Sequence, residues 1–229
     1  MNNEIENEFE IEKVVRIVDY KAGNAPSVMH AVTRLGFAAE YARGPGDIEG
    51  ATHILLPGVG SAKATMESLG ELGLTGALGD AVMGAGKLFL GICVGLQLIF
   101  EHSEEGGGAD CFGWLKGQVH RFDQAKVRVP QMGWNRTSFV KDVAFPARDD
   151  YFYYVNSYYA RPADSADIWG KSSHGDEFAA AIHSGNIYAT QFHIEKSGEA
   201  GLALLGGFLS LDCGPRRKRG PGKTEGAAC

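Results

Sequence analysis

The sequence has no uninterrupted apolar run of the roughly 20 residues that a membrane-spanning helix needs. Its longest apolar stretch, residues 88–100, is broken by glycine and polar residues. The four cysteines, at positions 93, 111, 213 and 229, form no CxxC or Cys/His pattern with zinc-ligand spacing. The first residues are acidic and contain no apolar stretch typical of a signal peptide. We therefore expect a cytoplasmic protein with reduced thiols, without a membrane segment and without a metal site.

Positive charge is also scarce, because 22 Lys and Arg residues stand against 28 Asp and Glu residues. No basic stripe dominates the part expected to fold, which argues against a nucleic-acid-binding protein. A hydrophobic content of 44% in 229 residues fits one large globular domain or at most two small ones. We expect an acidic arm at residues 1–12, a folded domain at 13–211, and a basic Gly/Pro-rich tail at 212–229. The tail cannot bury a core and is predicted to be disordered.

The first half of the sequence alternates strand-like and helix-like segments. Short apolar or β-branched runs predict strands at 13–20, 37–42, 52–60 and 87–93. Helical spacing or helix-forming composition predicts helices at 27–36, 61–85 and 94–105. This alternation predicts an α/β fold with a mostly parallel central sheet flanked by helices on both faces.

The second half contains short strand-like runs with turn residues between them. They predict strands at 117–121, 126–130, 151–159, 166–170, 178–183 and 187–192. Several of these strands are expected to be antiparallel, so the parallel core should carry additional antiparallel strands. A final helix is predicted at about 197–211.

The segment GICVG, residues 91–95, has the form of a nucleophile elbow. A strand leads to Cys93, small residues stand two positions before and after it, and a helix follows. Such a turn is expected to expose the thiol at the carboxyl edge of the sheet and to point it toward solvent. A helix N-terminus there favours the thiolate, which is the reactive form. The alternative is a buried core cysteine, the usual state of a lone Cys in an apolar run.

The segment QFHIEKS, residues 191–197, places His193 at the end of a strand and Glu195 two residues later. A thiol nucleophile needs a base within hydrogen-bond reach, and the base needs an orienting group. His193 could be that base, brought close to Cys93 by the fold, and Glu195 could hold its tautomer. The alternative is a surface histidine with a solvated glutamate nearby.

The segment LPGVG, residues 56–60, is a glycine-rich turn after a strand. It matches neither phosphate-binding pattern, GxGxxG or GxxxxGK[ST]. An oxyanion hole suits a thiol hydrolase better, because a tetrahedral intermediate needs donors directed at its oxygen. The N–H of Val94 would be one donor, and an N–H of the loop formed by Gly58, Val59 and Gly60 the other. A plain strand-to-helix turn is the alternative.

Together, LPGVGS, GICVGLQ and QFHIEKS occur in an order and at spacings that resemble the class I (triad) glutamine amidotransferases. The match covers about residues 13–211. Within that family, DYKAGN, PQMGWN and YVNSYY, residues 19–24, 130–135 and 154–159, resemble the glutaminase subunit of imidazole glycerol phosphate synthase. The resemblance implies a flavodoxin-like α/β core.

The resemblance also implies an activity, the hydrolysis of L-glutamine to glutamate and ammonia through a γ-glutamyl thioester on Cys93. His193 would transfer protons, Glu195 would orient His193, and Gln97 would help to hold the substrate. The ammonia would pass to a (β/α)8 cyclase subunit, the partner in a heterodimer, which makes imidazole glycerol phosphate and an aminoimidazole carboxamide ribotide in histidine biosynthesis. The PGVG loop would take part in switching the glutaminase on when the synthase binds its ligand. No cofactor and no metal is expected.

Three residues depart from the family pattern. Ile194 stands where the family has Pro between His and Glu, Lys21 where it usually has Gly, and Asn156 where His is common. Because Ile can also hold an extended backbone, we expect the catalytic geometry to survive with less rigidity. Lys21 and Asn156 lie in segments associated with the subunit interface. They bear on the partner and on regulation more than on hydrolysis.

Two other functions remain open at this point. One is an ammonia-donating glutaminase for a different barrel synthase, for instance in surface-sugar biosynthesis. The other is a non-catalytic regulatory paralogue, although an intact set of Cys93, His193 and Glu195 argues against it.

Overall fold

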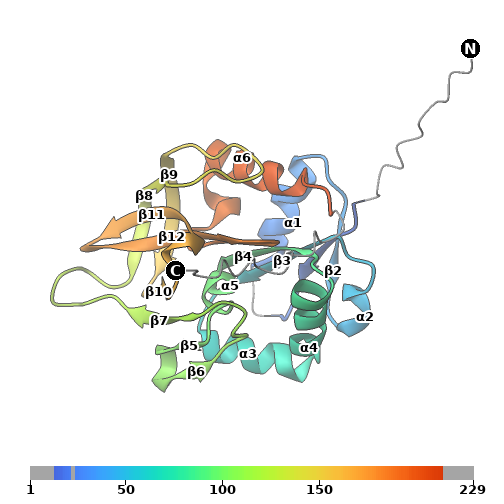
Figure 1. Cartoon of the computed structure of the whole chain (residues 1–229), viewed down its shortest axis with the longest axis horizontal. Helices are drawn as coiled ribbons and strands as arrows, with labels where there is room; N and C mark the ends of the chain where they lie inside the picture. Colours follow the sequence, from blue (N-terminus) through green and yellow to red (C-terminus); the bar gives the residue numbers. More distant parts are fainter. Residues whose placement is uncertain (1–12, 22–23, 214–229) are drawn as a thin grey trace, which may run out of the picture.

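The computed structural model describes residues 13–21 and 24–213 of the chain. In this part, the strands predicted for the first half form the parallel core of one large sheet (Figure 1). In sheet order these strands are β2 (Ala39–Ala42), β1 (Val15–Val18), β3 (His53–Gly58), β4 (Leu88–Cys93) and β13 (Ile187–Thr190). All neighbouring pairs run parallel. Strands β3, β4 and β13 are buried along their whole length, as strands covered on both faces should be.

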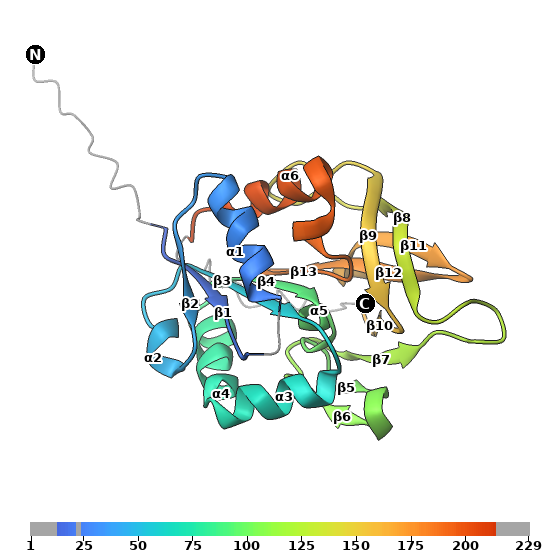
Figure 2. The ribbon, with the colours of Figure 1, turned by 180° about the vertical axis from the view of Figure 1, so that it is seen from behind.

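Helices cover both faces of this core, which Figures 1 and 2 show from opposite sides. One face carries α1 (Ala25–Arg34) and α6 (Gly198–Leu209), and the other carries α3 (Ala62–Glu71), α4 (Leu74–Gly79) and α5 (Val94–Gln97). The short α2 (Pro45–Ile48) lies beside β2 at the sheet edge. A π-helical turn at Asp80–Gly84 continues α4. The doubly covered parallel sheet confirms the predicted α/β fold.

The second half extends the sheet with mostly antiparallel strands. From β13 the order continues through β12 (Asp176–Ser184), β10 (Tyr158–Pro162), β7 (Gly117–Arg121), β5 (His102–Ser103) and β6 (Ala109–Asp110). A branch starts at β12 and leads through β11 (Ile168–His174) and β8 (Gln131–Phe139) to β9 (Asp150–Asn156). The branch lies over the carboxyl end of the parallel core and becomes part of the site described below (Figure 1).

The prediction of a strand at 126–130 is wrong. Its alternating valines suggested a strand, but the main-chain N–H groups of Lys126 and Val127 donate to Asp123 O at 3.0 and 3.1 Å. The Asp123 side chain also accepts from Ala125 N at 2.9 Å, a local pattern that favours a turn. The run at 151–159 forms two strands, β9 and β10, instead of one, and β8 was not predicted.

The helix predicted at 94–105 is also wrong beyond its first turn, because α5 ends at Gln97. The next main-chain oxygens accept hydrogen bonds from a distant loop: Phe112 N donates to Leu98 O at 2.9 Å, and Leu115 N donates to Ile99 O at 2.9 Å. Long-range pairing therefore replaces the intrahelical bonds that the apolar run would otherwise make. The chain then returns through β5 toward the carboxyl edge of the core.

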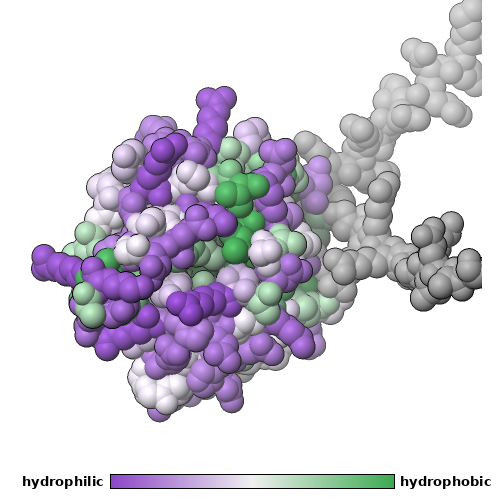
Figure 3. Space-filling view, turned by 60° about the vertical axis from the view of Figure 1, so that its left-hand side comes forward, coloured by the Kyte–Doolittle hydropathy of each residue, from purple (hydrophilic) through white to green (hydrophobic). Residues whose placement is uncertain are grey.

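The surface has few large exposed hydrophobic side chains, and the face in Figure 3 is predominantly hydrophilic. Those at least about one-third exposed are Val59, Met83, Met132, Trp134, Val140 and Tyr151. Three of the six lie on β8 and β9. The predictions for the acidic arm and the basic tail lie outside the described residues, except that Asp212 forms an ion pair with Lys13 at 3.5 Å.

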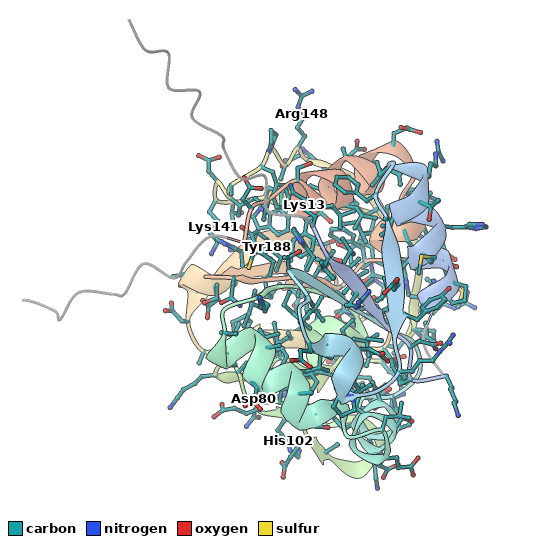
Figure 4. The ribbon with its side chains drawn as sticks, turned by 90° about the vertical axis from the view of Figure 1, so that its right-hand side faces the viewer. Lys13, Asp80, His102, Lys141, Arg148 and Tyr188 are labelled. Atoms are coloured by element: carbon teal, nitrogen blue, oxygen red, sulfur yellow. The ribbon has the colours of Figure 1, made fainter. Side chains whose placement is uncertain are left out.

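His53 is a fully buried polar residue at the start of β3. Its ring lies edge-on to Phe208 of α6, with centroids 5.4 Å apart, and its Nδ1 is 2.9 Å from Thr52 Oγ1. Burial lowers the pKa of His53 from 6.5 to about 4, and the positive charge of Lys13 acts in the same direction. Figure 4 views the molecule from the side on which Lys13 and Tyr188 lie.

We expect the free energy of unfolding to fall as the pH drops below 6.5, because the unfolded chain then protonates His53 while the folded chain keeps it neutral. The contribution is fully present above pH 6.5 and is lost as the pH approaches the folded-state pKa of about 4. Between pH 7.5 and pH 4.5 it amounts to at most about 2.5 kcal/mol. Urea denaturation at both pH values measures it. His53→Asn should lose less stability than the wild type over this range, and equal losses would contradict the assignment.

Candidate active site

Cys93 lies at a strained turn between a strand and a helix. It is the last residue of β4, and α5 begins at Val94. Its φ of 57° is positive, and Lys21 is the only other non-glycine residue with positive φ among residues 13–21 and 24–213. Backbone strain of this kind persists only where the surroundings enforce it, and it is concentrated at functional sites. The turn therefore has the backbone form of a nucleophile elbow.

The two glycines that flank Cys93 have no room for a side chain. A Cβ on Gly91 would lie 2.5 Å from Gly95 O, and a Cβ on Gly95 would lie 2.1 Å from Leu56 O of β3. Both contacts involve main-chain atoms, which cannot rotate away as the end of a side chain can. The GxCxG spacing thus reflects two positions where the turn packs directly against the sheet.

The expectation that the Cys93 thiol points toward solvent is wrong, because the residue is only 4% exposed. The branch of the sheet covers the elbow: Cys93 Sγ lies 3.8 Å from Val155 O of β9. It also lies 3.8 Å from Gln191 Nε2. Burial does not make Cys93 a core residue, however, because its side chain lines a pocket of about 260 Å³.

His193 reaches the same sheet edge because β13 runs parallel beside β4, with Thr190 opposite Ile92. Its main chain is held on both sides, since its N–H donates to Tyr153 O at 2.9 Å and its oxygen accepts from Ser197 Oγ at 2.6 Å. The ring is buried, and its Nδ1 is 3.0 Å from Glu195 Oε1. The side chain also lies within hydrogen-bond reach of Cys93.

The surroundings of His193 favour its protonated form. Burial alone would lower the pKa of His193, but hydrogen bonds with Cys93 and Glu195, together with their charges, raise it from 6.5 to about 10. The side chain of Glu195 is 0% exposed, so its charge is not screened by water. An imidazolium is the form that His193 takes after it accepts a proton from a thiol. The geometry is therefore suited to proton transfer between Cys93 and His193.

Ile194 connects the two residues within one tight turn. Lys196 N donates to His193 O at 3.0 Å, and a 3₁₀ turn spans Ile194–Lys196. The Ile194 side chain is 2% exposed, and a Cβ on Gly201 of α6 would lie only 2.0 Å from Ile194 O. Packing against the core and α6 thus holds this turn without a proline. The effect of Ile194 on rigidity stays a prediction.

The pocket beside Cys93 brings most of the predicted site residues together. Its lining includes Cys93, His193, Val59, Gly60, Val94 and Gln97. Two predicted residues lie just outside the lining. Glu195 lies behind His193, and Gly58 pairs with Cys93 in the β3–β4 register. Predicted residues from three distant parts of the sequence therefore border one cavity.

The predicted oxyanion loop lies directly on the elbow. A Cβ on Gly58 would lie 2.6 Å from Val94 Cβ and 3.0 Å from Gly95 N. Strand β3 continues through Gly58, so the turn begins at Val59 and not at the Pro57-Gly58 pair that the sequence suggested. Val59 and Gly60 then border the pocket, and Gly60 has a φ of +92°. The loop and Val94 border the same pocket as the thiol, and their role as donors stays a prediction.

Gln97 is buried in the pocket wall and joined to a residue that the sequence reasoning missed. Its Nε2 donates to Tyr158 O at 3.1 Å and to Gln191 Oε1 at 3.2 Å. Gln191 is fully buried, and its Nε2 is directed at Cys93 Sγ. The sequence did offer a signal for Gln191, because an amide at the end of an apolar strand is expected to be buried and a buried polar group needs a partner. A substrate contact by Gln97 stays a prediction.

Glu105 is a second missed residue. It lines the pocket, its Oε2 accepts from Ala62 N at 2.8 Å, and burial raises its pKa. It is the only acidic side chain in the pocket lining among the described residues. No sequence signal points to it, because its place depends on the chain leaving α5 early and returning through β5.

Asn156 and Lys21, two of the departures from the family pattern, lie in different surroundings. Asn156 is 5% exposed and lines the pocket, and its Nδ2 donates to Tyr158 O at 3.0 Å. Lys21 is exposed, with a φ of +69°. That backbone conformation favours glycine, so a lysine there is strained. The influence of either residue on activation by a partner stays a prediction.

No group of three or more His, Cys, Asp or Glu side chains that could hold a metal ion occurs in residues 13–21 and 24–213. Over the same residues, no helix is long and apolar enough to cross a membrane. Cys93, Cys111 and Cys213 are free thiols.

Comparison with known families defines the class. The family model described as glutamine amidotransferase class-I matches residues 16–209. A crystal structure of a glutamine amidotransferase superposes with a TM-score of 0.70 at 18% identity, covering 86% of this chain and 98% of that one. PurLQS from Thermotoga maritima gives a TM-score of 0.68, also at 18% identity, with coverages of 86% and 98%. The chain belongs to the class I glutamine amidotransferases.

Curated relatives place the chain more narrowly within this class. The chain is 39% identical over 202 residues to imidazole glycerol phosphate synthase subunit HisH 1 of Campylobacter jejuni, covering 86% of this chain and 100% of the relative. It is 41% identical to subunit HisH of Methanothermobacter thermautotrophicus, covering 86% of this chain and 98% of the relative. It is also 39% identical to the chloroplastic imidazole glycerol phosphate synthase hisHF of Arabidopsis thaliana, of which it spans 37%. Within the class I glutamine amidotransferases, the chain therefore belongs to the HisH family.

Proposed function

We propose that this chain is the glutaminase subunit of an imidazole glycerol phosphate synthase in histidine biosynthesis. It hydrolyses L-glutamine to glutamate and ammonia and delivers the ammonia to a (β/α)8 cyclase subunit in the cytoplasm. The observation that carries the proposal is the arrangement of Cys93, His193 and Glu195 beside one pocket of about 260 Å³. Membership of the HisH family supports the pathway and the partner.

In the first half of the reaction, His193 takes the thiol proton and Cys93 Sγ attacks the carboxamide carbon of glutamine. The resulting oxyanion accepts hydrogen bonds from the N–H of Val94 and from the loop at Gly58–Gly60. His193 then gives its proton to the leaving nitrogen, the C–N bond breaks, and ammonia departs. A γ-glutamyl thioester remains on Cys93.

In the second half, His193 takes a proton from a water molecule, which attacks the thioester carbon. The C–S bond breaks, glutamate leaves, and the proton returns to the sulfur of Cys93. Glu195 accepts from His193 Nδ1 at 3.0 Å and so keeps the other ring nitrogen directed at the thiol. Its buried negative charge stabilises the imidazolium that forms in each half.

Glu105 and Gln97 give the pocket the polar groups that an amino-acid substrate needs. We assign the carboxylate of Glu105 to the substrate α-ammonium group, because no other acidic side chain among the described residues lines the pocket. Gln97 also lines the pocket, and its Nε2 donates to Gln191 Oε1 at 3.2 Å. A half-buried carboxylate that selects an ammonium group discriminates glutamine from simple amides.

The cyclase is proposed to cover the exposed face of β8 and β9. Met132 and Trp134 are 67% and 57% exposed, and they stand opposite Val155 and Tyr153 in the strand register, so all four share one face. Val155 lines the catalytic pocket, and its oxygen lies 3.8 Å from Cys93 Sγ. An exposed aromatic and apolar strip next to the site of ammonia release fits a partner that must receive the ammonia before water does.

The function is tested by measuring glutamate release from glutamine with the chain alone and with the cyclase and its ribonucleotide ligand. We expect slow release alone and at least about 10-fold faster release in the complex. No turnover under either condition would overturn the proposal. Stimulation by another barrel synthase and not by the cyclase would identify that synthase as the partner and overturn the assignment to histidine biosynthesis.

Trp134→Glu should weaken the complex at least about 10-fold, because it places a charge at the centre of the proposed contact. Titration of the cyclase against the stimulated glutaminase rate measures the change. Met83→Glu is a matched control, since Met83 is 39% exposed on the π-helical turn at Asp80–Gly84, away from β8 and β9. Equal weakening by both variants, or by neither, would contradict the proposed docking face.

A further inference from the structure

The carboxylate of Glu195 is held through only one of its two oxygens. Oε1 accepts from His193 Nδ1 at 3.0 Å and from Asn24 Nδ2 at 2.6 Å. Oε2 is buried and has no hydrogen-bond partner among the described residues. The side chain is 0% exposed. Asn24 therefore provides the only hydrogen bond to this carboxylate besides that of His193 within the described chain.

Asn24 comes from a distant part of the fold. It stands 171 residues before Glu195, immediately before α1. Its main-chain oxygen accepts from Ser27 N at 3.2 Å and from Val28 N at 3.3 Å, which ties it to the first turn of that helix. Ala25 and Val28 are fully buried, and α1 packs against the turn at Ile194–Lys196. The position of the amide is thus set by the docking of α1 on the catalytic turn.

We infer that Asn24 is a fourth, positioning member of the site, whose amide holds the Glu195 carboxylate in the place where it bonds His193. The inference rests on the proposed function and deepens it. A buried carboxylate with a single partner is costly, and a second N–H donor lowers that cost. Besides Asn24 and His193, no group of the described chain donates a hydrogen bond to this carboxylate, so the loss of Asn24 would leave His193 Nδ1 as its one anchor.

A neutral amide suits this position better than a charged donor does. A lysine or arginine there would neutralise Glu195 and weaken its hold on the imidazolium. An amide has no proton to lose or gain between pH 5 and pH 9, so its support does not depend on pH. The other titratable groups near Glu195 are Cys93 and His193 on one side. On the other side, across a pocket of about 460 Å³, the titratable groups are His30 and Arg34 of α1 and the adjacent Lys196.

Two replacements of similar size separate positioning from simple packing. Asn24→Leu removes the donor at every pH, and we expect kcat to fall at least about 10-fold with a pH-independent ratio to the wild type. Asn24→Asp places a carboxylate beside Glu195 at high pH and, once protonated, an O–H donor in the place of the amide. Its kcat relative to the wild type should therefore rise at least about 10-fold from pH 8.5 to pH 6. Asn24 does not line the catalytic pocket, so KM for glutamine should change less than about 3-fold in both.

A second readout does not depend on glutamine turnover. The rate of Cys93 alkylation by iodoacetamide, located by peptide mapping, reports how well His193 and Glu195 support the thiolate. Asn24→Leu should slow the alkylation of Cys93 at pH 7. Asn24→Asp should also slow this alkylation relative to the wild type, but less at pH 6 than at pH 8.5. Equal alkylation in the three proteins would overturn the inference, as would a flat pH ratio for Asn24→Asp. If the wild type releases no glutamate but alkylation follows the expected pattern, the proposed function fails and the inference stands.

Discussion

Replacement of Cys93 with alanine is expected to lower glutamine hydrolysis by at least about 10⁵-fold, because the covalent route disappears with the sulfur. His193 and Glu195 would remain in place but would have no nucleophile to activate. Synthesis by the assembled complex with added ammonium salt should continue, because the cyclase subunit then needs no glutaminase. Glutamate release and ammonia-dependent synthesis, measured on the same preparation, separate loss of chemistry from loss of assembly.

Cys111 supplies a matched control within the same chain. It is also a free thiol, but burial raises its pKa to about 11, and it lines no part of the catalytic pocket. Cys111→Ala should therefore retain glutamine hydrolysis within about 3-fold of the wild type. Turnover by Cys93→Ala above about 1% of the wild-type rate would contradict a thioester mechanism.

Replacement of Gly95 with alanine is expected to destabilise the fold by about 3 kcal/mol or more and to abolish glutamine hydrolysis. The new Cβ would lie 2.1 Å from Leu56 O, a buried main-chain oxygen of β3. Relief requires that the elbow move away from β3. Any such movement displaces Cys93 from His193 and the Gly58–Gly60 loop from the thiol. Urea denaturation and glutamate release measure the two effects.

Gly76→Ala tests whether the loss comes from crowding and not from glycine replacement in general. Gly76 lies in α4, and nothing lies within 4 Å of its ideal Cβ position. Alanine there should raise the free energy of unfolding by about 0.5–1 kcal/mol, because it favours the helix over the unfolded chain. A stable, active Gly95→Ala protein would show that the elbow is not packed against β3 as described.

Local sequence patterns were sufficient for the parallel core and for most of the site. Strands β1, β3 and β4 follow from apolar runs bounded by turns, and parallel strands bring their carboxyl ends to one edge. That edge rule is why Cys93 and His193, 100 residues apart in the sequence, could be predicted as partners. The glycines around Cys93 could also be explained from the sequence, since a crowded turn excludes side chains.

Contacts between distant segments were not predictable in the same way. Helix α5 stops at Gln97 because a later loop bonds to Leu98 and Ile99, and this early stop delivers Glu105 to the pocket. The burial of Cys93 depends on β9 folding over the elbow. The bond from Asn24 to Glu195 depends on how α1 docks. Each of these results from tertiary pairing that no local pattern encodes.

The most direct test of the central claim, that Cys93 is a nucleophile activated by His193 in a glutamine-binding pocket, is labelling with an electrophilic glutamine analogue followed by peptide mapping. The account predicts one modification per chain, on Cys93, that is blocked by L-glutamine and strongly slowed in His193→Ala. Labelling of Cys111 or Cys213 at the same rate, or labelling of Cys93 that glutamine does not prevent, would contradict it.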